Sequence, residues 1–218
     1  MREDLQIRRL ESLLDRKVLP RFQKLHAEIR REIRSGRLDC AGAFWLIHSD
    51  IHGMSHWVRV ACLGLRIAEL AWTGKGLAED EEALLLAAFF HDAARTRESL
   101  DTGHGQRGAC LLEAFAGPLA WDPGIVAIAA DAIRRHEGQA EAIPPRSGRV
   151  ASALANADRL DRVRFGDRAE GSLMHPDGVW PDLQKASWAL VERVDEARIR
   201  EAGLLEPLAT AWGRSDSG

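Results

Sequence analysis

Residues 81–95 read EEALLLAAFFHDAAR, a stretch that joins an acidic start, a wholly apolar middle and a His-Asp pair. Acidic side chains are favoured in the first turn of a helix, where the helix dipole is positive. A helix that is apolar on all sides is buried in the protein. We therefore predict a central helix over residues 81–95 that carries His91 and Asp92 into the core.

Helical periodicity continues on both sides of this stretch, and the sequence shows neither an alternating strand pattern nor an internal repeat. An amphipathic stripe occupies residues 1–36, where Pro20 should kink or split the helix. A loop with Ser49 and Asp50 can cap a second helix that runs to about Trp72. Further helices are predicted over residues 102–115, 123–136 (after Asp122), 149–164 and, as one or two helices, 182–212. The sequence therefore predicts an all-α protein, a single-domain helical bundle over residues 1–218.

Composition excludes several classes of protein. The net charge of −3 gives no basic face, so nucleic acid is not an expected partner. Cys40, Cys62 and Cys110 are too far apart for a disulfide framework and fit a reducing compartment. The charged N-terminus is unlike a signal peptide, and the longest apolar run, residues 83–90, is too short for a membrane span. We expect a cytoplasmic protein without membrane contact, and its oligomeric state stays open.

Six titratable residues fall where apolar residues fall in the helical pattern, and so point toward the interior. They are His56, His91, Asp92, His104, His136 and Asp158. Neutral imidazole and carboxylate oxygen are ligands for a divalent metal ion, and a buried charge needs such a partner. Two alternatives to a metal site stay open. A single buried histidine is more often a hydrogen-bonded core residue, and the aspartates could pair with Arg95, Arg159 or Arg162.

Taken together, these residues resemble the signature of the HD-domain superfamily of metal-dependent phosphohydrolases. That signature has a His on one helix, a His-Asp pair on a later helix and a distant Asp. The matching segments are HGMSHWVRV with His56, FFHDAAR with His91 and Asp92, and NADRLDRVR with Asp158. The resemblance covers about residues 51–164 and implies a bundle of the HD-domain type in which these four residues bind one metal ion.

Two further histidines match the dinuclear members of this superfamily. The resemblance implies that Asp92 bridges to a second ion, which His104 and His136 complete. The ions would be Fe, Mn, Co, Ni, Zn or Mg, one or two per chain. The segments AIRRHEG and NADRLDRVR are similar to those of bacterial HD hydrolases that cleave dinucleoside polyphosphates symmetrically. Those enzymes usually have Thr-Thr-Gly after the third His, where this chain has Glu137 and Gly138.

The activity implied by the resemblance is hydrolysis of a phosphate ester or anhydride in a nucleotide or another small phosphorylated molecule. Most HD phosphohydrolases carry Lys three residues after the HD aspartate, where this chain has Arg95. Arg95, with Arg107 or Arg135, could neutralise the phosphate, although each has a solvated surface position as its alternative, and Arg107 and Arg135 fit that alternative better. Two other functions stay open, a dinuclear-iron oxygenase of the HD type and a non-catalytic ligand-binding protein.

His52 is the remaining candidate for a catalytic role beside Asp92 and Arg95. His52 and His56 have the spacing of an HExxH zinc helix, but Gly53 stands where that motif needs its general-base Glu. A metalloprotease is therefore not expected. With a helix that begins by Ile51, His52 lies one turn from His56, where it contacts substrate or hydrogen-bonds to a ligand. The other histidines, His26, His48 and His175, are expected on the surface or in loops.

Overall fold

The part of the chain that the computed structural model describes is helical and contains no strand, which confirms the all-α prediction. The described residues are 2–39, 43–44, 46–49, 51–74, 77–137, 145–166, 181–206 and 208. The elements are α1 (Arg2–Leu13), a π-helical turn η1 (Leu14–Val18), α2 (Leu19–Arg34), α3 (Met54–Ala71), α4 (Leu77–Phe90), α5 (His104–Ala116), α6 (Pro123–Arg135), α7 (Pro145–Leu160), a 3-10 helix η2 (Asp161–Phe165), α8 (Pro181–Arg193) and α9 (Glu196–Glu201). None of the helices in these ranges has the length and apolar character needed to cross a membrane.

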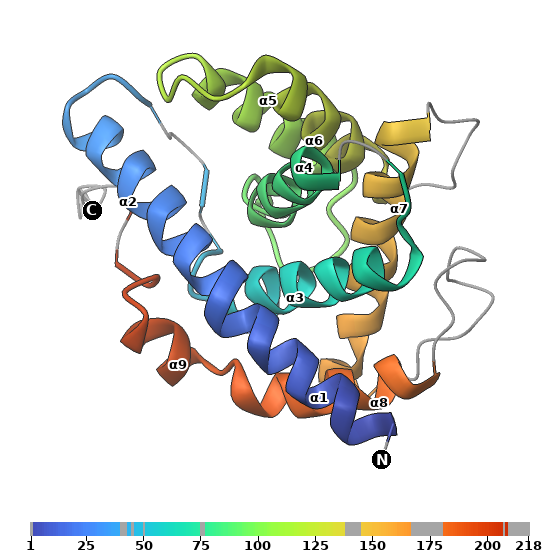
Figure 1. The fold of residues 1–218 in the computed structure, drawn as a ribbon. Helices are drawn as coiled ribbons and strands as arrows, with labels where there is room; N and C mark the ends of the chain where they lie inside the picture. Colours follow the sequence, from blue (N-terminus) through green and yellow to red (C-terminus); the bar gives the residue numbers. More distant parts are fainter. Residues whose placement is uncertain are drawn as a thin grey trace.

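The first two helices form one long rod along the side of the molecule (Figure 1). Pro20 is the second residue of α2 and follows the π-helical turn η1. A proline removes one backbone donor from a helix, and a π turn is one way in which a helix absorbs such a change. Pro20 therefore marks a change in helix type and does not split the rod. Helix α1 packs on α8, so the first helix lies against a helix from the C-terminal quarter of the sequence.

Helix α4 lies at the centre, in contact with α3, α5, α6 and α7 (Figure 1). Every residue from Ala83 to Phe90 is buried, as the apolar sequence predicts. Phe89 packs edge-on against Phe22 of α2, with ring centroids 5.1 Å apart, and against Trp57 of α3 at 5.6 Å. Fully burying such a side chain contributes about 2–3 kcal/mol. The packing of the apolar residues of α4 thus fixes where His91 and Asp92, which follow its last residue, must lie.

Several helix ends differ from the predicted ones. Helix α4 covers residues 77–90 and not 81–95, because hydrogen bonds after Phe90 close shorter three-residue turns, such as Arg95 N–H to Asp92 O at 3.0 Å. Helix α3 begins at Met54 and not by Ile51. The turn of residues 46–49 packs so closely on Gly53 that a Cβ there would lie 2.3 Å from the Ser49 carbonyl oxygen.

Three other predicted ends can be compared with the structure. Helix α5 begins at His104, since the φ of 82° at Gly103 interrupts a right-handed helix. Asp122 caps α6 as predicted, with Oδ1 accepting from the backbone N–H of Gly124 at 2.8 Å and of Ile125 at 2.9 Å. The segment predicted as one helix from residue 149 is α7, which starts at Pro145, followed by the tighter η2. Asp50, Gly138 and His175 lie outside the described residues.

Helix α5 approaches α4 closely through Gly108. A Cβ at Gly108 would lie 2.6 Å from the carbonyl oxygen of Phe90 and 3.1 Å from that of His91. These are rigid backbone atoms, so added volume must move one of the helices. The approach sets the distance between His91 and the start of α5.

We predict that Gly108→Ala lowers the free energy of unfolding by about 1–3 kcal/mol, because its methyl group meets the α4 backbone. Gly117→Ala is the matched control, since nothing lies within 4 Å of its Cβ and its φ is −62°. Urea unfolding of both variants measures the difference. Equal stability of the two variants would contradict the close approach of α4 and α5.

Candidate metal centre

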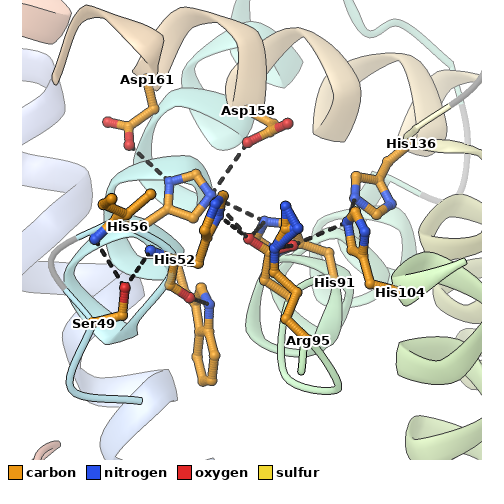
Figure 2. A network of polar contacts seen from close by, with 12 residues as sticks. Ser49, His52, His56, His91, Arg95, His104, His136, Asp158 and Asp161 are labelled. Carbon is orange, nitrogen blue, oxygen red and sulfur yellow. Dashed lines mark hydrogen bonds and ion pairs between the residues drawn. The ribbon is translucent and has the colours of Figure 1, made fainter. Parts of the chain in front are cut away.

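Five helices bring the six predicted ligand residues to one place (Figure 2). His56 lies in the first turn of α3, and His91 and Asp92 directly follow the last residue of α4. The remaining three are His104 at the start of α5, His136 at the end of α6, and Asp158 in the last turn of α7. Each of these side chains continues an apolar stripe of its helix, so packing of the stripes on one core drives the polar groups together.

The four histidine rings are each held through Nδ1 by an oxygen atom. The pairs are His56 to Asp161 Oδ2 (2.7 Å), His91 to Ala88 O (2.9 Å), His104 to Asp101 O (2.7 Å) and His136 to Ile133 O (2.6 Å). Carbonyl and ionised carboxylate oxygens only accept hydrogen bonds, so Nδ1 carries the proton in every ring. In a neutral ring Nε2 is then left with a lone pair, which is the form in which imidazole binds a metal ion.

These Nε2 atoms face one another in pairs. Those of His56 and His91 lie 3.2 Å apart, and those of His104 and His136 lie 3.0 Å apart. When both rings of a pair are neutral, their two lone pairs repel each other unless a positive charge lies beside them, either a proton shared between the two nitrogens or a metal ion. The rings could therefore serve as ligands of a cation.

Asp92 lies between the two histidine pairs and divides its oxygens between them. Oδ2 is 3.6 Å from His56 Nε2 and 3.7 Å from His91 Nε2, whereas Oδ1 is 3.1 Å from His104 Nε2. Asp158 adds Oδ1 at 3.2 Å from His56 Nε2. Among the described residues, three groups of potential ligands have their ligand atoms within 4.8 Å of one another. They are His56, His91 and Asp158; Asp92, His104 and His136; and His52, His56 and Asp92.

Protonation at the centre follows from its burial and charges. Burial lowers the pKa of His91 to about 3, so its imidazole is neutral at physiological pH. Burial raises the pKa of Asp92, but the neighbouring imidazoles, His91 first, hold it well below its usual range. Burial lowers the pKa of His104, yet its bond to Asp92 raises the value above that of a free histidine. An anionic carboxylate that favours positive charge on a neighbouring ring is an environment suited to a cation.

Exposure is uneven across the centre. Asp158 keeps 33% of its side-chain exposure, more than the predicted interior position implies, whereas Asp92 keeps 4%. Asp158 lies in the last turn of α7, directly before η2. Solvent therefore reaches the ligand cluster beside Asp158.

His52 precedes α3 and is held by a turn of its own. Ser49 Oγ accepts hydrogen bonds from the backbone N–H of Ile51 at 3.0 Å and of His52 at 2.9 Å. The His52 ring donates Nδ1–H to Asp92 Oδ2 at 2.9 Å (Figure 2). Trp57 Nε1–H donates to the His52 carbonyl oxygen at 2.7 Å. His52 thus contacts the ligand cluster even though the helix begins later than predicted.

The predicted phosphate-binding arginines have different surroundings. Arg95 is buried, with Nε 3.4 Å from Asp92 Oδ1, and its Nε and Nη1 atoms form no hydrogen bond within the described residues. Arg107 donates to Asp101 Oδ1 at 2.6 Å, and Arg135 donates to Asp131 Oδ1 at 2.8 Å. Of these three, only Arg95 lies against the ligand cluster with donors to spare.

Sequence reasoning missed several polar residues behind the ligands. Asp161, fully buried, accepts from His56 and from Arg59, and the His104 ring also pairs through Nδ1 with Glu137. The spacing of Asp158 and Asp161, one helical turn apart, was the available signal. His26, predicted on the surface, is in fact buried. Its Nε2–H donates to the Glu206 carbonyl oxygen at 2.9 Å because α2 packs on the chain after α9.

Comparison with known families agrees with this geometry. The family model of the HD domain matches residues 53–163, half of the chain. The chain therefore belongs to the HD domain family, whose members are generally metal-dependent phosphohydrolases. The comparisons with curated proteins and with solved structures gave no match.

The donor set fits a divalent metal ion. Neutral imidazole nitrogens with carboxylate oxygens suit zinc and the other first-row transition metals, and carboxylates with water suit magnesium. The facing nitrogen lone pairs favour the first group. His56, His91, Asp92 and Asp158 could hold one ion, and Asp92, His104 and His136 a second.

We predict that Asp92→Ala abolishes the rise in melting temperature on adding Zn²⁺ or Mn²⁺, because a ligand that binds only the folded state stabilises it. Asp122→Ala is the control. It loses the α6 cap, at a cost of about 1 kcal/mol, but keeps every candidate ligand. Thermal unfolding with and without metal measures the effect. An unchanged metal response in Asp92→Ala would contradict the assignment.

Proposed function

We propose that this protein is a metal-dependent phosphohydrolase that cleaves a phosphate ester or anhydride of a nucleotide or another small phosphorylated molecule. Membership of the HD domain family supports the general class. One structural observation carries the proposal further, namely the buried guanidinium of Arg95 beside the ligand cluster.

Arg95 has positive charge and unused donors where a substrate anion would lie. A buried polar group without a hydrogen bond costs about 1–3 kcal/mol, and more when it is charged. The Nε and Nη1 atoms of Arg95 are buried in this way, next to Asp92. The planar fork of a guanidinium matches the oxygens of a phosphoryl group. A phosphate bound at the metal centre would satisfy these donors.

The chemistry of such a site has separate parts. A divalent ion held by these histidines and aspartates would supply Lewis acidity, which would lower the pKa of a water molecule and polarise the phosphoryl oxygen. Arg95 neutralises the charge that gathers on the phosphoryl oxygens as the bond to the leaving group breaks. Asp92, held by the histidines on both sides, keeps the two ligand groups in fixed relation. Burial of His56 and His91 limits access of bulk water, which strengthens each of these electrostatic contacts.

His52 is suited to hold the substrate or the leaving group. Its Nδ1–H is engaged with Asp92, so its orientation is fixed and Nε2 stays available for a hydrogen bond to the substrate. Its side chain is 14% exposed, so it lies nearer the solvent than His56. His52 and the more exposed Asp158, at 33%, are the members of the cluster that a substrate would meet first.

We predict that Arg95→Ala lowers kcat/KM for phosphate release about 10- to 100-fold, the loss expected when a charged hydrogen bond is removed. Metal content stays at the wild-type level, since Arg95 is not among the ligands. Arg135→Ala is the control, because its guanidinium pairs with Asp131 of the same helix. The substrates to screen are nucleoside mono-, di- and triphosphates, dinucleoside polyphosphates and cyclic nucleotides, each with manganese, iron, cobalt and magnesium.

The same screen separates the other two functions. Metal-loaded protein that releases no phosphate, but consumes oxygen with an organic substrate, would be an HD-type oxygenase. Saturable binding of a nucleotide without turnover under every metal would make the protein a ligand-binding member of the family. Phosphate release that is equal in Arg95→Ala and the wild type would contradict the role assigned to Arg95.

A further inference from the structure

We propose that Arg59 is a positioning residue for the metal centre, which fixes His56 through the carboxylate of Asp161 and ties it to the C-terminal helices. The inference rests on the part of the proposed function that makes His56 a metal ligand. It does not depend on the choice of substrate.

Asp161 is the acceptor that holds His56, and its carboxylate is fully engaged. Oδ2 accepts His56 Nδ1–H at 2.7 Å, Arg59 Nη2–H at 3.1 Å and Arg164 Nη1–H at 3.0 Å, while Oδ1 accepts Arg59 Nε–H at 2.7 Å. A carboxylate offers about four lone-pair positions. Asp161 therefore cannot rotate away from His56 without breaking other charge-assisted bonds.

Arg59 and Arg164 hold the carboxylate in different ways. Arg164 lies three residues from Asp161 in the same short helix η2, donates to Oδ2 alone, and is anchored by its Nε–H to the carbonyl oxygen of Ile51 at 3.1 Å. Arg59 lies one turn after His56 on α3 and grips both oxygens of Asp161 with a two-pronged contact. His56 and Arg59 of α3 thus both bind the carboxylate of Asp161, and the fixed position of this carboxylate sets the angle of the His56 ring.

The same guanidinium reaches the C-terminal part of the fold. Arg59 Nη1–H donates to the carbonyl oxygen of Val194, 135 residues away, where α8 has just ended. Carbonyls at the end of a helix have no partner within it, and an arginine is a favourable donor for them. Helices α8 and α9 lie outside residues 53–163 that match the HD domain. This bond connects them to the His56 ring through Arg59 and Asp161.

A purely structural role is the alternative for Arg59. Asp161 is fully buried, and removing one partner of a buried ion pair destabilises a protein whatever else that pair does. Stability alone therefore cannot distinguish the two roles. The affinity for metal can distinguish them. When a metal-binding histidine loses the group that hydrogen-bonds to its other ring nitrogen, the affinity for metal typically falls 10- to 100-fold.

The test compares Arg59→Met with Arg66→Met. Arg66 lies two turns further along α3, is also largely buried, and joins α3 to α1 through Gln6 at 2.7 Å, away from the metal centre. Titration calorimetry gives the Kd for Co²⁺, and the Co²⁺ absorption spectrum reports the geometry of the ligands. We expect both variants to melt earlier, and only Arg59→Met to bind Co²⁺ about tenfold or more weakly.

Two further variants complete the design. Asp161→Asn should weaken Co²⁺ binding as well, and the double variant Arg59→Met, Asp161→Asn should bind no more weakly than Asp161→Asn alone, since Arg59 acts through that carboxylate. Arg59→Lys keeps the charge but not the two-pronged contact, so its Kd should fall between the wild type and Arg59→Met. It also carries the test if Arg59→Met does not fold.

Three results would overturn the inference. They are a wild-type Kd and spectrum in both Arg59 variants, an equal loss of affinity in Arg66→Met, and a double variant whose losses add. A wild-type protein that binds no Co²⁺ would remove the metal centre itself, and with it the proposed function. Normal Co²⁺ binding without phosphate release would instead leave the role of Arg59 open to the same comparison and contradict only the hydrolase.

Discussion

One electrostatic constraint governs the whole molecule, the placement of the Asp92 carboxylate among four imidazole rings that all present Nε2. Charge buried to this extent is tolerated only when it is paired or bound to a metal ion. Each ring is fixed from behind by an acceptor at Nδ1, so the lone pairs cannot turn away from one another. The apolar faces of five helices supply the packing energy that holds this arrangement in place.

Helix α4 carries both core residues and, directly after its end, candidate metal ligands. Its apolar residues pack on all neighbouring helices, and His91 and Asp92 follow immediately where that apolar run ends. The close approach at Gly108 places α5, and with it His104, beside this end. Packing therefore decides the position of the polar groups, and the hydrogen bonds behind them decide their orientation.

Much of the fold and of the ligand set could be predicted from the sequence because both depend on local periodicity. His56, His91 and His136 continue apolar stripes, which is enough to place them toward a shared core. The Asp122 cap could be predicted because its acceptor and the donors lie within three residues. The starts of α3 and α5 could not be predicted in this way. The first depends on how the turn of residues 46–49 packs on Gly53, and the second on the left-handed backbone conformation of Gly103.

The residues behind the ligands were beyond the reach of local patterns. His56 and Asp161 are 105 residues apart, and Arg59 contacts Val194 across 135. His26 is buried where α2 meets the segment after α9, near Glu206. Asp158 was predicted to point into the interior but is partly exposed. Helical periodicity predicts the direction in which a side chain points, but not how completely other residues cover it.

The most direct test of a cation site at Asp92 is a crystal structure of the protein grown with Zn²⁺, with anomalous differences measured at the zinc edge. We predict anomalous peaks about 2.0–2.1 Å from the Nε2 atoms of His56 and His91, and of His104 and His136, on either side of Asp92. Zinc peaks found only at surface residues outside this cluster, with these four Nε2 atoms hydrogen-bonded to one another or to water, would contradict the cation site.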